Sequence, residues 1–110
     1  MSEFTFLFRG NDLDALSHEQ MQNYTQKWLA WMKEHGLSHN GHPLERSGKV
    51  VKGNEKSVHD GPYAEAKDIV NGYLVVEARD LAHAVEISKD CPILDLGGAV
   101  EVRPIRILKR

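Results

Sequence analysis

The first apolar positions of the chain alternate with polar or smaller ones. Phe4, Phe6 and Phe8 are separated by Thr5 and Leu7, and this period of two predicts a strand over residues 3–9. Residues 72–78 are almost continuously apolar, as in a strand buried on both faces. Residues 99–108 are expected to form the last strand, in which Pro104 indicates an edge position or a bulge.

Apolar residues recur at helical spacing in two other segments. Ser17 and Gln20 have the spacing of a capping box, and they predict a helix near residues 18–35 that ends at Gly36. One face of this helix carries Met21, Tyr24, Trp28, Trp31 and Met32. A second helix is expected after Asp80, and it must stop at or before Cys91 because Pro92 follows.

The middle of the chain is polar and rich in turn residues. Residues 37–47 are expected to be a connector, whereas residues 48–52 and 57–59 are short extended segments that form a hairpin. The chain then turns abruptly at Asp60-Gly61-Pro62-Tyr63, and residues 64–68 form a brief helical turn. The order strand, helix, strand, strand, helix, strand predicts an α+β fold, the ferredoxin-like βαββαβ antiparallel sheet with two helices on one face.

The face of the sheet away from the helices needs a cover. We expect Thr5, Leu7 and Arg9 to lie there, with either Tyr73 and Val75 or Leu74 and Val76, and with Glu101, Arg103 and Ile105. This face is apolar in its middle and charged at its edges. A homodimer whose sheets pack face to face would bury it and leave a cleft, and the alternative is a monomer with a hydrated sheet face.

Composition narrows the class of protein. The 110 residues form one domain, 1–110, of ordinary globular composition with 41% hydrophobic residues. A formal net charge of −2 with scattered basic residues argues against nucleic-acid binding. The sequence shows no membrane span or signal peptide and has a single cysteine, so we expect a cytoplasmic protein with no membrane partner.

Several short motifs resemble those of one known family. The run from His59 to Lys67, His-Asp-Gly-Pro-Tyr-Ala-Glu-Ala-Lys, is similar to the signature of YciI-related proteins of the DGPF type. Gly72-Tyr73, Cys91-Pro92 and the segment 100–104 match the same pattern in the same order, and Tyr63 stands where Phe is commoner. The resemblance implies a bacterial protein with a ferredoxin-like fold assembled as a dimeric α+β barrel. It also implies a mostly undefined role, with a His–Asp pair proposed as catalytic in some relatives and a dehydrochlorinase activity in one.

The corner after residue 59 offers the main candidate chemistry. Asp60 and His59 are the expected catalytic acid–base residues if the turn brings them together. The alternative is structural, with the Asp60 carboxylate accepting backbone N–H bonds across the turn. Neighbouring Glu65 and Lys67 form either a surface pair or part of the cleft.

Other residues are expected to contact a ligand. Glu101 and Arg103 share one strand face, where Arg103 could hold a carboxylate or form a structural ion pair with Glu101. Tyr63, Lys67 and His42 complete the expected substrate-binding set. His35, His39 and His42 are four and three residues apart, which resembles the spacing of metal ligands. His35 ends the predicted helix and His39 lies in the connector, which favours solvated side chains, so we expect no metal. Cys91 is expected to be a small buried residue.

These features predict a cleft for a small anionic or aromatic molecule and no bound cofactor. If the protein is an enzyme, proton transfer, as in an isomerase or lyase, fits the available groups. The alternative is a non-catalytic binding or regulatory module, because the resemblance includes relatives linked to sigma-type transcription factors. A third alternative is a structural dimer without a ligand.

Overall fold

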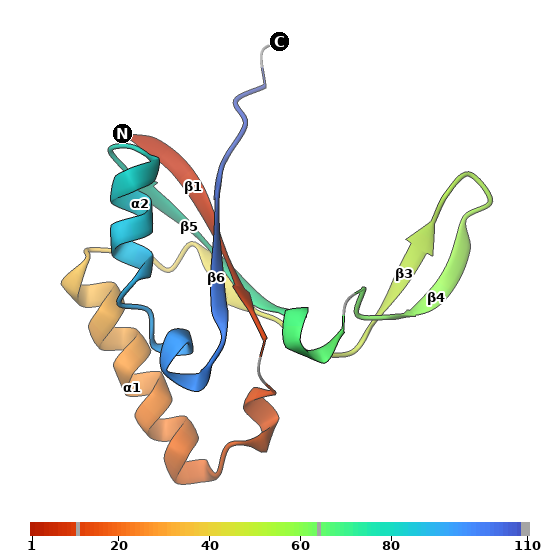
Figure 1. Cartoon of the computed structure of the whole chain (residues 1–110), viewed down its shortest axis with the longest axis horizontal. Coiled ribbons are helices and arrows are strands. Elements are labelled where there is room, and N and C mark those ends of the chain that lie inside the picture. Colours follow the sequence, from red (N-terminus) through yellow and green to blue (C-terminus); the bar gives the residue numbers. More distant parts are fainter. Residues whose placement is uncertain (11, 64, 109–110) are drawn as a thin grey trace.

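The computed structural model describes residues 1–10, 12–63 and 65–108. Four strands form one antiparallel sheet in the order β2-β5-β1-β6, and Figure 1 shows α1 and α2 on the same side of it. The strands are β1 (Ser2–Arg9), β2 (Gly41–Pro43), β5 (Val70–Ala78) and β6 (Ala99–Pro104). This strand order with two helices on one face is the ferredoxin-like α+β fold that the sequence predicts.

The two long helices begin where the sequence indicates. Helix α1 (His18–Glu34) has a complete capping box: Ser17 Oγ accepts from the Gln20 backbone N–H at 3.1 Å, and the Gln20 side chain accepts from the Ser17 N–H at 2.8 Å. It ends before Gly36, whose φ of 63° lies in the left-handed region. Helix α2 (Leu81–Ser88) starts at Asp80, whose side chain accepts from the His83 N–H.

The core lies between the helices and one face of the sheet. Phe4, Phe6 and Phe8 of β1 point into it, and so do Leu74 and Val76 of β5, the directly opposed partners of Phe6 and Phe4. Val100 and Val102 of β6 pack against its edge. Trp31 is buried between the layers, and Ile87 of α2 lies beside it. The period-two prediction for β1 is therefore confirmed.

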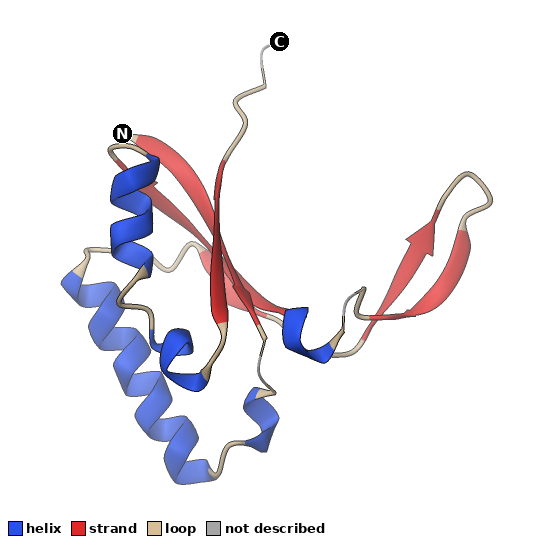
Figure 2. Cartoon of the chain, viewed as in Figure 1, coloured by secondary structure: helices blue, strands red, loops and turns tan. Residues whose placement is uncertain are grey.

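Among the described residues, no helix lies over the opposite face of the sheet. Leu7 is opposed to Tyr73 and Thr5 to Val75, which places Tyr73 and Val75 rather than Leu74 and Val76 on this face. Strand β5 is thus covered on one side only within the single chain, although its sequence resembles that of a strand buried on both faces. Figure 2 shows this one-sided arrangement.

The hairpin predicted over residues 48–52 and 57–59 is confirmed, but it does not supply the second strand of the sheet. The strand that joins the sheet is β2, inside the segment expected to be a polar connector, and its three residues pair with Leu74, Tyr73 and Gly72 of β5. Residues 48–61 instead form a separate two-stranded hairpin of β3 (Gly48–Lys52) and β4 (Ser57–Gly61), which we call the arm. Figure 1 shows the arm projecting away from the body of the molecule.

The part of the chain that the structure describes also contains the 3₁₀ helices η1 (Leu13–Ala15), η2 (Ala66–Asp68) and η3 (Pro92–Leu96). Of the turn predicted over residues 64–68, residue 64 lies outside the described residues. Strand β6 is an edge strand, as Pro104 indicates, but it ends there rather than at residue 108. Among the described residues, no helix has the length and apolar character needed to cross a bilayer.

Candidate functional site

A cavity lies beside α1 at the β2 edge of the sheet. Its volume is about 740 Å³, which is within the usual range for pockets that hold small molecules. Its walls come from η1, α1, the segment 39–47 that carries β2, and the start of β5. Segments distant in the sequence therefore meet around it.

Aromatic side chains form the inner wall of this cavity. Trp28 is half-buried, and its ring meets the ring of Phe8 edge to face at a centroid distance of 4.6 Å. Tyr24 and Trp31 contact Trp28 at 6.0 and 5.2 Å, so the indole is held from three sides. Such a wall offers an aromatic, apolar surface to a ligand.

Tyr24 carries an unusual hydroxyl. The residue is buried, and its hydroxyl finds no hydrogen-bond partner among the described residues. Burial raises the pKa of Tyr24 to about 12, because the phenolate form would lose its hydration. The hydroxyl therefore stays neutral at physiological pH.

Polar residues also line the cavity, and we refer to this group of lining residues as its rim. Asn71, which is 7% exposed, donates from Nδ2 to the buried Gly10 carbonyl and accepts at Oδ1 from Arg46 Nη1 at 3.2 Å. This chain of bonds orients the Arg46 guanidinium. Glu45 and His39 also line the cavity, so acidic, basic and titratable groups all belong to its lining.

The structure places the predicted catalytic pair away from this cavity. Asp60 and His59 are exposed residues of β4 in the arm, opposed to Lys49 and Val50 respectively, and so lie on opposite faces of the hairpin. The Asp60 carboxylate forms an ion pair with Lys49 Nζ, and His59 Nε2 lies 3.1 Å from Ser57 Oγ. Within one chain, then, His59 and Asp60 are not brought together.

Glu101 and Arg103 share the uncovered sheet face, as predicted from their spacing. Glu101 Oε1 accepts from Arg9 Nε at 2.8 Å, whereas its other oxygen lies 3.9 Å from Arg103 Nε. Arg9 also donates to the Asp68 carbonyl at 2.6 Å, so Glu101 belongs to a structural tie between β1, β6 and η2. The Arg103 side chain is 68% exposed.

The remaining predicted residues are dispersed. Tyr63 is exposed, and its ring centroid lies 5.9 Å from Nζ of Lys52, the last residue of β3. Lys67, in η2, is also exposed. His42 lines the cavity, and its ring contacts that of Tyr73 at 6.1 Å. His42 is thus the predicted site residue that the structure places at the cavity.

Sequence reasoning missed most of the rim. Arg46 and Asn71 belong to segments that carry no motif, and they meet because Leu44 N–H donates to the Asn71 carbonyl at 2.7 Å beside the β2–β5 pairing. A three-residue strand is too short to show a period. The sequence places Trp28 on the apolar face of its helix, and that position gives no sign that one side of the indole borders a cavity.

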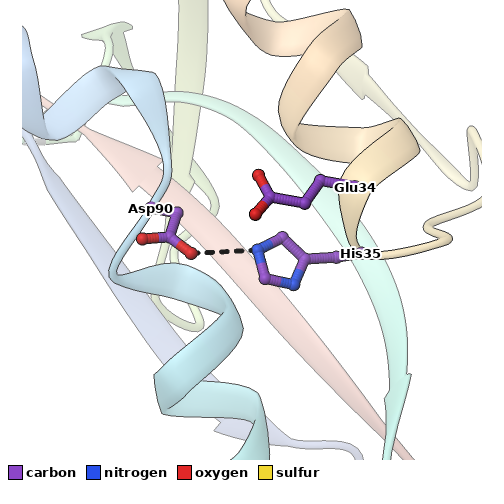
Figure 3. Close-up of side chains that lie close together, drawn as sticks. All are labelled: Glu34, His35 and Asp90. Atoms are coloured by element: carbon purple, nitrogen blue, oxygen red, sulfur yellow. Dashed lines mark hydrogen bonds and ion pairs between the residues drawn. The ribbon is translucent and has the colours of Figure 1, made fainter.

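A separate cluster lies at the junction of the two long helices. Figure 3 shows Glu34, His35 and Asp90 turned toward one another, with potential ligand atoms within 4.8 Å of each other. His35 Nε2 lies 3.1 Å from Asp90 Oδ2, which joins the end of α1 to the segment after α2. His35 therefore pairs with Asp90, and not with His39 and His42 as its spacing would suggest for a shared metal. The exposed acids Glu34 and Asp90 fit a solvated inter-helix contact.

Comparison with known proteins identifies the family. Residues 11–109 match the family model of the YCII-related domain, which is nearly the whole chain. This protein belongs to the YCII-related family. No curated protein matches the chain.

The YCII-related chain also resembles a solved structure. It is similar to a 5-chloro-2-hydroxyhydroquinone dehydrochlorinase from Burkholderia phenoliruptrix, solved in complex with 2,5-dihydroxybenzoquinone. The TM-score is 0.51 at 17% sequence identity, and the match covers 94% of this chain and 93% of the other. At that identity the likeness establishes the fold.

Proposed function

We propose that this YCII-related protein binds a small anionic aromatic molecule in the cavity beside α1. The observation that carries the proposal is the combination of aromatic side chains and an arginine, Arg46, in the lining of one cavity of about 740 Å³. A planar ring fits against Trp28 and Phe8, where burial of apolar surface favours binding. A carboxylate or phenolate at its edge faces Arg46.

Acid–base chemistry without a cofactor is the reaction class that these groups support. Isomerisation of a hydroxylated ring, or loss of a leaving group from it, needs a base that takes one proton and an acid that returns one. His39, His42 and Glu45 supply both kinds of group at the rim. Both reactions are redox-neutral overall, so neither needs an external oxidant.

The family relation supports the choice of ligand class. The dehydrochlorinase of similar fold acts on a chlorinated hydroxyhydroquinone and was solved with a dihydroxybenzoquinone. The latter compound is planar, acidic and small enough for the cavity, which makes it a suitable first probe.

Isothermal titration with 2,5-dihydroxybenzoquinone tests the proposal. We expect Arg46→Gln to weaken binding about tenfold or more, because a charged hydrogen-bond donor is lost. The matched control is Arg79→Gln, an exposed arginine outside the cavity lining, which should leave the affinity unchanged. If Arg103→Gln abolishes binding and Arg46→Gln does not, the ligand lies on the uncovered sheet face and the cavity assignment is wrong.

Turnover distinguishes an enzyme from a binding module. Chloride release from 5-chloro-2-hydroxyhydroquinone, lost in His42→Gln or His39→Gln with the fold intact, supports acid–base catalysis. Binding of the probe without chloride release supports the non-catalytic ligand-binding alternative, or a different leaving group.

A further inference from the structure

The C-terminal ends of α1 and α2 bring three potential metal ligands together. Glu34 is the last residue of α1, His35 is its C-cap, and Asp90 follows the C-cap of α2. One ligand atom from each side chain lies within 4.8 Å of the others, and Figure 3 shows that they come from two separate helix ends. His35 and Asp90 are 55 positions apart, so the fold and not a sequence motif assembles this group. None of the three residues lines the cavity beside α1.

The spacing of these atoms suits a first-row transition-metal ion. Zinc lies about 2.1 Å from imidazole nitrogen and carboxylate oxygen, so two ligand atoms of a tetrahedral zinc ion are about 3.4 Å apart. His35 Nε2 and Asp90 Oδ2 are already 3.1 Å apart. Glu34 is exposed, so a rotation of its side chain can bring a carboxylate oxygen the remaining distance.

Buried contacts hold the chain on both sides of this group. Trp31, one turn before His35, donates from Nε1 to the Ile87 carbonyl of α2 at 2.9 Å. Its ring also meets the His35 imidazole at a centroid distance of 6.4 Å, and the His35 side chain is 21% exposed. The imidazole is therefore oriented before an ion binds, which reduces the conformational entropy that binding costs.

The charges at this junction favour a cation. The carboxylates of Glu34 and Asp90 both lie at helix C-termini, where the backbone carbonyls already place partial negative charge. Asp90 pairs with His35, whereas Glu34 forms no hydrogen bond or ion pair with the described residues. The neighbouring Lys89 is paired with Glu86 at 2.8 Å. A divalent ion would balance both carboxylates and remove the repulsion between them.

We propose that Glu34, His35 and Asp90 bind a divalent first-row transition-metal ion that links the end of α1 to the end of α2. Neutral His35, in the tautomer protonated at Nδ1, offers its Nε2 lone pair to the ion, and each carboxylate supplies one oxygen. An imidazole nitrogen among the ligands favours zinc or a similar ion over Ca²⁺ and Mg²⁺, which prefer oxygen ligands. The ion acts as a structural cross-link behind Trp31.

Zinc titration of the metal-free chain tests the proposal. Untagged protein, treated with EDTA and dialysed, should bind Zn²⁺ in isothermal titration, and Zn²⁺ should raise the midpoint of thermal unfolding. Glu34→Gln is the most direct variant, because the lost carboxylate has no partner among the described residues and the metal-free midpoint should not change. We expect it to weaken Zn²⁺ binding about tenfold or more and to reduce the metal-dependent rise accordingly.

Two further ligand variants and one control separate coordination from a general effect on the fold. His35→Gln and Asp90→Asn should also weaken Zn²⁺ binding about tenfold or more, whereas Asp90→Glu, which keeps a carboxylate, should retain part of the affinity. The control is His18→Gln, an exposed histidine at the other end of α1, which should leave the Zn²⁺ affinity unchanged. Circular dichroism of each metal-free variant establishes that it is folded.

Three results would overturn the inference. Equal Zn²⁺ affinity in the wild-type chain and in Glu34→Gln would exclude the site. Loss of Zn²⁺ binding in His42→Gln but not in His35→Gln would place the ion in the cavity, which His42 lines. Displacement of Zn²⁺ by millimolar Ca²⁺ would contradict an imidazole ligand. The titration contains no aromatic ligand, so its outcome is independent of the function proposed for the cavity.

Discussion

The indole Nε1 of Trp31 donates to the carbonyl oxygen of Ile87 at 2.9 Å, and this buried bond joins α1 to α2. The Ile87 carbonyl lies near the end of α2, where backbone acceptors lack partners within the helix. The bond therefore satisfies a group that would otherwise be buried without one.

Replacing Trp31 should destabilise the fold through that carbonyl. Trp31→Phe keeps an aromatic ring but removes the donor, and we expect the free energy of unfolding to fall by about 1–3 kcal/mol. Urea unfolding measures the change. Gln26→Ala, an exposed position on the same helix, is the control and should change stability by less than about 0.5 kcal/mol. Equal effects of the two substitutions would show that the bond contributes nothing.

Helix α1 should depend on its capping box. Ser17→Ala removes the side-chain acceptor of the Gln20 N–H, and we expect a loss of about 1 kcal/mol. The midpoint of thermal unfolding should fall by a few degrees, whereas Ser38→Ala in the following exposed loop should leave it unchanged. An unshifted midpoint in Ser17→Ala would mean that tertiary contacts alone define the start of α1.

The β2 edge should require glycine at position 41. A Cβ there would collide with the Tyr73 carbonyl and lie 2.7 Å from Leu74 Cα, because β2 and β5 approach closely. Gly41→Ala should cost about 1–3 kcal/mol and weaken ligand binding, since β2 forms one wall of the cavity. Gly48→Ala in the arm is the matched control, because a Cβ there meets nothing within 4 Å. Unchanged unfolding and probe titration in Gly41→Ala would contradict this role for the β2 edge.

Alkaline pH should destabilise the protein through two buried groups. Burial raises the pKa of Cys91 from 9.0 to about 12 and that of Tyr24 from 10.0 to about 12. Above pH 9 the unfolded chain releases these protons while the folded chain keeps them, so the unfolded state is increasingly favoured as pH rises toward 12. Each group should cost about 1.4 kcal/mol per pH unit once pH exceeds its unfolded pKa.

Urea unfolding between pH 7 and 11 measures this loss. The decline should begin near pH 9, and Tyr24→Phe should flatten it only above about pH 10. Cys91→Ala should flatten it from about pH 9, on a lower baseline because the substitution leaves a small void. A pH profile identical in all three proteins would show that neither group drives the loss.

Local chemistry was enough to predict much of the fold. Ser17 and Gln20 define the start of α1 within four residues of chain, and the phenylalanines of β1 show which side of that strand is buried. Glu101 and Arg103 are two positions apart, and the sequence predicts that they share one face because side chains along a strand alternate between its two faces.

Only the tertiary structure decided where the cavity lies and which strand joins the sheet. Strand β2 has three residues and exists because Gly41 permits a close approach to β5, a contact between segments about thirty residues apart. Arg46 and Asn71 form a hydrogen bond beside the same contact, and no sequence pattern within either segment predicts this bond. Periodicity and capping act over one or two turns of chain, so they predict elements. The cavity and the direction of the arm depend on contacts between distant elements. The free energy of those contacts contributes only when the chain is folded.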